Sequence, residues 1–264
     1  MGKFSGTVTL ITGASSGIGA ALALEIAREG GDVALCARRR EKLEEVAQKI
    51  AGMGRSSLPI TCDVAREGDI EKALAEAADF FGQINYVVAN AGFGVAGPVE
   101  KLTMEDYRRQ FETNVFGVIR TAQAARAYLA KTKGCLGIIG SVNGYLPLAG
   151  ASAYCMSKAA VHSFANALRL ELKKQGVAVV LIVPGFVASE LRKVDRKGVF
   201  RPEVRDYVPP WLQLPAEEAA RRIAAALLRR KRVEVVTMHG KAAVFLKRHF
   251  PGLTYSVLTR FGKN

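Results

Sequence analysis

The sequence has few of the residues that build metal sites and disulfide frameworks, and it has no long apolar run. It contains four cysteines and three histidines among 264 residues, no two cysteines form a Cys-x-x-Cys pair, and the histidines do not cluster with them. This scarcity argues against zinc or disulfides and favours buried, reduced thiols. No uninterrupted run of about 18 apolar residues occurs, and the first apolar run breaks at glycine before signal-peptide length. We therefore expect no metal, no spanning helix and a cytoplasmic location.

Acidic residues are almost absent from the end of the chain. Residues 221–264 contain eleven Lys or Arg and one acidic residue, Glu234, and the whole chain has a formal net charge of +14. Such an end attracts anionic partners or is simply a solvated basic face. The tail from 240 to 264 mixes basic and apolar residues, so it could contact an anionic membrane surface or pack on its own domain or a neighbouring subunit. We favour packing. We expect no nucleic acid, because no recognised nucleic-acid motif is present.

Two hydrophobic periodicities alternate through the first two thirds of the chain. Short apolar or β-branched runs are separated by longer stretches with helical spacing, which predicts a Rossmann-like, doubly wound α/β fold with a parallel sheet covered on both faces. No shift in composition divides this region, so we expect a single domain over 1–264, with an insertion at about 185–215 and a basic segment at about 240–264. The predicted strands are 7–12, 32–37, 58–64, 84–90, 134–141, 177–184 and 233–238; the predicted helices are 18–29, 41–51, 67–81, 104–130, 153–175 and 216–231.

A glycine-rich turn joins the first predicted strand to the first predicted helix. Its sequence is T-G-A-S-S-G-I-G (12–19). Glycines allow close backbone approach, and the free N–H groups at a helix N-terminus attract a pyrophosphate. Tight packing alone is the structural alternative, but the strand–turn–helix context favours a dinucleotide. The expected contacts are Gly13, Ser15, Ser16, Gly17, Ile18 and Gly19.

The spacing T-G-x-x-x-G-x-G resembles that of the short-chain dehydrogenase/reductase family. Further matches follow in the family's order over roughly residues 5–190, namely Asp63-Val64, Asn90-Ala91-Gly92, Asn114, Ser141, Tyr154-x-x-x-Lys158 and Pro184-Gly185. The resemblance implies an oxidoreductase that transfers hydride between a nicotinamide and a carbonyl or secondary alcohol. A catalytically idle NADP-binding sensor or scaffold is the alternative, and the complete set of catalytic residues argues against it.

Proton transfer is assigned to four residues by this resemblance. A tyrosine hydroxyl ordinarily has a pKa of about 10, and a nearby cation lowers it toward the working range of an acid–base catalyst. Tyr154 and Lys158 stand at i and i+4, so a helix places them on one face. Ser141 would donate a hydrogen bond to the substrate oxygen, and Asn114 would hold a water linking Lys158 to solvent. Tyr154 and Lys158 also count among the expected cofactor contacts, Lys158 at the nicotinamide ribose.

The end of the second strand predicts NADP(H) rather than NAD(H). It reads Cys36-Ala37-Arg38-Arg39-Arg40, where a carboxylate would bind a ribose 2′-hydroxyl and arginine accommodates a 2′-phosphate. Arg38 is the expected phosphate ligand; a basic helix start is the plainer explanation for the run. By resemblance, the remaining contacts are Asp63 and Val64 at the adenine, Asn90, Ala91 and Gly92 at the adenosine ribose, and Pro184, Gly185, Val187 and Ser189 at the nicotinamide.

The segment 185–215 is rich in proline and interrupts the alternating pattern. We expect it to cover the substrate, and its apolar residues favour an apolar or lipid-like carbonyl compound. These residues are Leu191, Val194, Val199, Phe200, Tyr207, Val208 and Trp211. Cys155, Met156 and His162 are expected to pack rather than react. The resemblance also implies a homodimer or homotetramer, assembled through the predicted helices 104–130 and 153–175.

Overall fold

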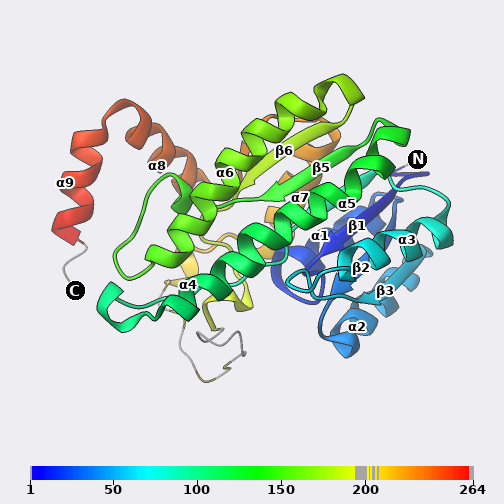
Figure 1. The fold of residues 1–264 in the computed structure, drawn as a ribbon, viewed down its shortest axis with the longest axis horizontal. Coiled ribbons are helices and arrows are strands. Elements are labelled where there is room, and N and C mark those ends of the chain that lie inside the picture. The colour runs from blue at the N-terminus through cyan, green and yellow to red at the C-terminus, as the bar shows by residue number, and fades with distance from the viewer. Residues whose placement is uncertain (1, 194–200, 202, 204–205, 207, 262–264) are drawn as a thin grey trace.

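Seven parallel strands form one sheet in the computed structural model, which describes residues 2–193, 201, 203, 206 and 208–261 (Figure 1). The order is β3-β2-β1-β4-β5-β6-β7, and every neighbouring pair is parallel. This confirms the predicted Rossmann-like fold class. The strands are β1 (Val8–Thr12), β2 (Asp32–Ala37), β3 (Ser57–Thr61), β4 (Tyr86–Ala89), β5 (Cys135–Ile139), β6 (Ala178–Val183) and β7 (Val233–Val235).

Helices cover both faces of the sheet. In β1, Leu10 packs into the cluster under one helical layer and Ile11 into the cluster under the other. The central strands are therefore buried along their whole length and mainly apolar, instead of alternating. In Figure 1, α5 and α6 lie in front of the sheet and α7 behind it. One layer contains α3 (Asp69–Phe81), α5 (Gly117–Thr132) and α6 (Ser152–Leu172); the other contains α1 (Gly17–Arg28), α2 (Arg40–Ala51) and α7 (Ala216–Leu228).

The predicted helix 104–130 differs from the structure. It is divided into α4 (Met104–Phe111), a π-helical turn over Glu112–Phe116, and α5. A π turn contains one extra residue, so side chains beyond it rotate relative to those before it. The turn contains Asn114, which is fully buried behind the wall of the site described below.

The end of the chain also differs from its predicted form. The last strand stops at Val235 instead of 238, because Thr237 begins a helix by accepting a hydrogen bond from the Gly240 amide. Two helices follow, α8 (Met238–His249) and α9 (Pro251–Phe261), which project at one end of the molecule (Figure 1). In the part of the chain that the structure describes, no helix has both the length and the apolarity needed to cross a bilayer.

Candidate active site

A cavity of about 480 Å³ opens at the carboxyl ends of the strands. In a doubly wound sheet, this edge is where ligands bind, near the point where strand order reverses. The cavity brings together all of the predicted site residues except Gly19 and Asn114, which lie behind its wall. The predicted residues that line it are Gly13, Ser15, Ser16, Gly17, Ile18, Arg38, Asp63, Val64, Asn90, Ala91, Gly92, Ser141, Tyr154, Lys158, Pro184, Gly185, Val187 and Ser189.

The glycine turn is built so that backbone, not side chain, faces the cavity. Gly13 and Gly17 have φ angles of +68° and +55°, which disfavour residues with a Cβ. A Cβ on Gly13 would stand 2.8 Å from the Ala91 Cα, and one on Gly19 would overlap the Gly13 carbonyl oxygen. Gly19 does not line the cavity. Because it lacks a Cβ, it lets the start of α1 pack closely against Gly13 at the end of β1. The cavity accordingly has a bare peptide surface at a helix N-terminus, which suits a pyrophosphate.

Asn90 holds this turn in place from the end of β4. Its side-chain amide donates to the carbonyl oxygens of Thr12 at 2.9 Å and Gly13 at 3.1 Å. In return, the Thr12 hydroxyl accepts hydrogen bonds from the backbone amides of Asn90 and Ala91, each at 3.0 Å. Asn90 thus joins two neighbouring strand ends. Its side chain is a support for the turn as well as part of the cavity wall.

Two arginines at the end of β2 line the cavity, and they differ in their contacts. Arg38 is exposed and makes no recorded hydrogen bond within the described residues. Arg39 donates to the hydroxyls of Ser15 at 3.1 Å and Ser16 at 2.8 Å, and it pairs with the Glu190 carboxylate at 3.1 Å. Sequence reasoning chose Arg38 and did not single out Arg39. The structure connects Arg39 to the turn because segments far apart in sequence meet there.

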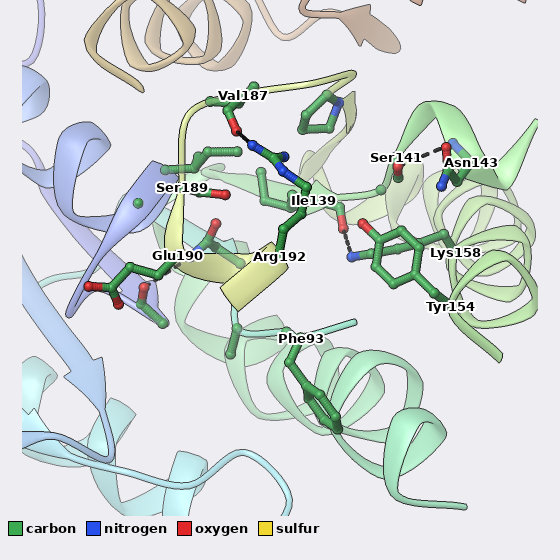
Figure 2. Close-up of a pocket in the computed structure, with 18 of the residues that line it drawn as sticks. Phe93, Ile139, Ser141, Asn143, Tyr154, Lys158, Val187, Ser189, Glu190 and Arg192 are labelled. Atoms are coloured by element: carbon green, nitrogen blue, oxygen red, sulfur yellow. Dashed lines mark hydrogen bonds between the residues drawn. The ribbon is translucent and has the colours of Figure 1, made fainter. Parts of the chain in front are cut away.

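Tyr154 and Lys158 come from the same face of α6 and extend toward the end of β5 (Figure 2). The Lys158 Nζ lies 5.8 Å from the centre of the Tyr154 ring and donates to the Ile139 carbonyl oxygen at 2.8 Å. Lys158 is only 4% exposed, and burial lowers the pKa of its ammonium to about 8. A cation therefore stands next to the tyrosine inside the cavity.

Ser141 lies at the end of β5, with its hydroxyl beside the tyrosine (Figure 2). Its Oγ accepts a hydrogen bond from the Asn143 amide at 3.1 Å, so its own proton stays available for an oxygen in the cavity. Its backbone amide donates to Nε2 of His162 at 3.3 Å. His162 is buried, and burial together with the charge of Lys158 lowers its pKa to about 4. The imidazole is therefore neutral and, since Nε2 accepts, carries its proton on Nδ1.

His162 positions the segment around Ser141, a role that the sequence did not reveal. Its ring packs at 4.5 Å, centre to centre, against the Tyr145 ring. A Cβ built on either Gly140 or Gly144 would overlap the imidazole, so both glycines make room for it. The expectation that His162 packs is compatible with these contacts, but it missed the bond to the Ser141 amide. The i, i+4 spacing from Lys158 was the available signal.

Asn114 lies behind the cavity wall, inside the π turn. Its side chain accepts from the Phe93 amide at 3.1 Å and donates to the Phe93 carbonyl at 3.0 Å and the Ser157 hydroxyl at 3.3 Å. The amide therefore fixes the segment after β4 against α6. The water-holding role that the resemblance implies for Asn114 remains a prediction.

His239 anchors the loop that follows β6. Its Nε2 accepts from the Phe186 amide at 3.1 Å, and its ring stacks on the Phe186 ring at 5.5 Å. Because Nε2 accepts from that amide, the Thr237 hydroxyl 3.1 Å away must donate to it. The first turn of α8 is thereby fixed to the part of the cavity where the resemblance places the nicotinamide.

The covering segment is only partly as predicted. Arg192 joins described parts of it by donating to the Asp206 carboxylate at 2.7 Å and to the Gln213 side chain at 3.0 Å. Val208 is buried but does not line the cavity. Trp211 is 82% exposed and does not line the cavity either, so neither residue lies where a side chain that covers the substrate was expected. Val194, Val199, Phe200, Tyr207 and the Leu191 side chain lie outside the described residues.

One part of the cavity wall is apolar. The side chains there come from the segments after β4 and β5, from the loop after β6, and from both C-terminal helices. They are Phe93, Val142, Leu146, Leu148, Phe186, Ala243 and Leu258. Val142 directly follows Ser141, so this apolar part of the wall begins next to that residue.

Comparison with known proteins identifies relatives over most of the chain. A family model described as short chain dehydrogenase matches residues 7–199. The chain is 33% identical over 235 residues to an 11-beta-hydroxysteroid dehydrogenase A from Sesamum indicum, covering 86% of this chain and 67% of that protein.

Two solved structures illustrate the similarity in three dimensions. A short chain dehydrogenase/reductase from Burkholderia phymatum in complex with NAD has a TM-score of 0.84 at 23% identity, over 96% of both chains. An alcohol dehydrogenase from the archaeon Thermococcus sibiricus, complexed with 5-hydroxy-NADP, has a TM-score of 0.74 at 28% identity, over 87% of this chain and 94% of that one. One of these structures holds NAD and the other an NADP derivative.

Proposed function

This chain belongs to the short-chain dehydrogenase/reductase family, and we propose that it transfers hydride between NADP(H) and an apolar carbonyl or secondary-alcohol substrate. One observation carries the proposal. Tyr154, Lys158 and Ser141 border the same cavity as the bare peptide surface of the glycine turn. An acid–base group, a cation and a hydrogen-bond donor thus lie within one enclosure with a site for a dinucleotide.

Each residue of the site has a separate chemical role in the proposed reaction. When bound, the nicotinamide supplies or accepts the hydride. The Ser141 hydroxyl donates a hydrogen bond to the substrate oxygen and orients it. The Tyr154 hydroxyl gives that oxygen a proton during reduction and takes it back during oxidation. The Lys158 ammonium favours the phenolate form of Tyr154 and would contact the nicotinamide ribose. Asn114 would hold the water through which Lys158 exchanges protons.

The preference for NADP(H) is supported by charge at the end of β2. Arg38 lines the cavity without a recorded partner among the described residues, so its guanidinium is available for a ribose 2′-phosphate. Arg39 lies beside it, bonded to both serine hydroxyls of the turn. Asp63 and Val64 would flank the adenine, and Ala91 and Gly92 the adenosine ribose. Pro184, Gly185, Val187 and Ser189 would face the nicotinamide.

The apolar nature of the substrate is supported by the wall beside the catalytic residues. Val142, Leu146 and Leu148 follow Ser141 in the segment after β5 and line the same cavity, as does Phe186 after β6. A sugar placed there would lose hydrogen bonds to water without replacing them, which costs affinity. A steroid-like or fatty-acyl-like carbonyl compound would bury apolar surface instead. The sesame relative is named as a hydroxysteroid dehydrogenase, which is consistent with this class of substrate.

The decisive experiment combines a substrate panel with one variant. The purified protein is assayed with NADPH against steroid, fatty-acyl, sugar and quinone carbonyls, and the best substrate is then used for Tyr154→Phe. We expect kcat to fall by roughly 10²–10⁴-fold, because the general acid is lost. NADPH affinity, measured by titration calorimetry, should be nearly unchanged.

Tyr128→Phe, on α5 outside the cavity, is the matched control and should retain normal turnover. Near-normal activity of Tyr154→Phe would remove the tyrosine from the mechanism. Tight NADPH binding by the unmodified protein, with no turnover of any compound in the panel, would support the idle sensor instead.

A further inference from the structure

The two C-terminal helices carry an unusual share of the exposed apolar side chains. Sixteen large hydrophobic residues are exposed in the described part of the chain, and seven of them lie within the span 238–261. We call this span, which contains α8, Phe250 and α9, the C-terminal hairpin. Its exposed apolar residues are Met238, Phe245, Leu246, Phe250, Leu253, Tyr255 and Val257.

The hairpin is also purely basic. It contains Lys241, Lys247, Arg248 and Arg260, and no Asp or Glu occurs anywhere from residue 235 to the end of the chain. The Lys247 ammonium lies 3.6 Å from the centre of the Tyr255 ring, which joins α8 to α9. A surface with cations and no anions is complementary to an anionic partner.

The hairpin projects from the body of the protein. In Figure 1, it occupies one end of the long axis, with α9 outermost, whereas α3 lies at the opposite end. Gly240 and Thr254 are its buried residues. On α9, Leu253 and Val257 are one turn apart, so they share a face. Leu253 and Val257 therefore form an exposed apolar strip on α9, and basic residues lie on both helices of the hairpin.

We propose that the C-terminal hairpin binds an anionic lipid surface, lying in the interfacial plane of the membrane. Apolar side chains gain free energy by entering the acyl region, and the flanking basic residues gain by approaching lipid phosphates. A nucleic acid would satisfy the charges but leave Phe245, Leu253 and Val257 in water. The helices have 12 and 11 residues, a length that suits lying on a bilayer and not crossing it.

The same hairpin forms part of the cavity wall, so docking on lipid would also place the cavity near the membrane. Ala243 of α8 and Leu258 of α9 line the cavity, and His239 fixes α8 to the loop after β6. A hairpin seated on lipid would therefore hold the apolar side of the cavity next to the bilayer. The docking proposal itself does not depend on the proposed function.

Co-sedimentation with vesicles tests the proposal on the full chain. We expect binding to vesicles of equimolar phosphatidylglycerol and phosphatidylcholine, little binding to phosphatidylcholine alone, and weaker binding as salt is raised. The double variant Phe245→Glu/Leu253→Glu should lower the partition coefficient by roughly tenfold for each side chain. Lys241→Gln/Arg248→Gln, whose side chains are exposed, should lower it by about fivefold for each charge removed.

Phe80→Glu is the matched control, because Phe80 is 59% exposed on α3, at the far end of the molecule. It should bind vesicles like the unmodified protein. The charge variant guards against misfolding, since it removes surface charges only, and NADPH affinity reports the folded state of every variant.

Three outcomes would overturn the proposal. The first is no binding to anionic vesicles by the unmodified protein. The second is an equal loss in Phe80→Glu. The third is a halved mass in light scattering for Phe245→Glu/Leu253→Glu with no change in vesicle binding, which would assign the hairpin to a second copy of the chain.

Discussion

Lys158 and His162 occupy successive turns of α6, and burial lowers the pKa of both bases from different ordinary values. The pKa of Lys158 is lowered to about 8 and that of His162 to about 4. At neutral pH the lysine therefore keeps its charge beside Tyr154, while the histidine stays neutral. Only the neutral imidazole offers Nε2 as an acceptor for the Ser141 amide. One helix face thus supplies a cation to one catalytic residue and a fixed backbone to another.

The first residue-scale prediction concerns stability in acid. The unfolded chain protonates His162 near its ordinary pKa of 6.5, and the folded chain only near 4. Between these values the unfolded state binds more protons, so lowering the pH favours unfolding. We expect His162 alone to remove up to about 3 kcal/mol of the unfolding free energy as the pH falls through this range. Urea unfolding at about pH 7 and about pH 4.5 measures the loss.

His162→Gln provides the comparison for that measurement. Its amide oxygen can accept from the Ser141 amide but does not titrate in this range. The variant should be less stable than the unmodified protein at neutral pH, yet it should lose less stability on acidification. Identical losses in the two proteins would contradict the prediction.

The second residue-scale prediction concerns the dinucleotide. Arg38→Ala should weaken NADPH binding by roughly 10–100-fold, because a charge-assisted hydrogen bond to the 2′-phosphate is lost, and it should change NADH binding little. Glu190→Gln should act in the opposite direction. Its carboxylate pairs with Arg39 beside the serines of the turn, where it would repel the phosphate. Titration calorimetry with both dinucleotides gives the two dissociation constants.

Arg40→Ala is the control for this series. Arg40 follows Arg39 directly, but it pairs with Glu44 and the Pro59 carbonyl and does not line the cavity. Its removal should leave both affinities unchanged. Equal losses of NADPH and NADH affinity in Arg38→Ala would argue against a phosphate-binding role.

At the scale of elements, hydrophobic periodicity predicted the sheet and most helices closely. The predicted strand 32–37 coincides with β2, and the predicted helix 41–51 differs from α2 by one residue. Parallel strands end at one edge of the sheet, which brings together motifs that are distant in sequence. The π turn at Glu112–Phe116 was not predicted, and its Asn114 bonds to the distant segment after β4. The contacts of Arg39 with Glu190 and of His162 with Ser141 also join distant segments, and local pattern carries no information on them.

The junction of β1 and α1 carries the element-scale prediction. Gly19→Ala would force a Cβ into the Gly13 carbonyl oxygen, and backbone cannot move aside as a flexible side chain can. We expect a loss of about 3 kcal/mol in unfolding free energy and weaker NADPH binding, because the turn must open. Urea unfolding and calorimetry measure the two effects.

Gly52→Ala, just after α2, is the matched substitution. Gly52 has a helical φ of −61°, and a Cβ there would make ordinary contacts of 3.5 Å or more. It should be neutral or stabilise the protein by up to about 1 kcal/mol, because the unfolded chain loses conformational freedom. Similar destabilisation by both alanines would contradict the overlap with the Gly13 carbonyl oxygen as the cause of the loss.

At the scale of the whole molecule, the surfaces proposed to bind cofactor, lipid and a second copy of the chain lie in different places. The cofactor cavity opens at the carboxyl ends of the strands, the hairpin projects at one end of the long axis, and α5 and α6 cover the front of the sheet (Figure 1). We call the helical layer formed by α5 and α6 the front layer. It exposes Phe116, directly before α5, and Leu170, near the end of α6. Apolar side chains in such a layer favour association with another copy of the chain.

The last prediction is therefore a homodimer or homotetramer that forms through α5 and α6 and leaves the hairpin uncovered. Phe116→Glu/Leu170→Glu should lower the mass measured by light scattering at least twofold, because each new carboxylate would be buried against its symmetry mate. Phe80→Glu should leave the mass unchanged. A monomeric mass for the unmodified protein at every concentration would contradict the assembly. If the double variant dissociates yet still sediments with anionic vesicles, then self-association and lipid binding use separate faces, as the positions of the front layer and the hairpin require.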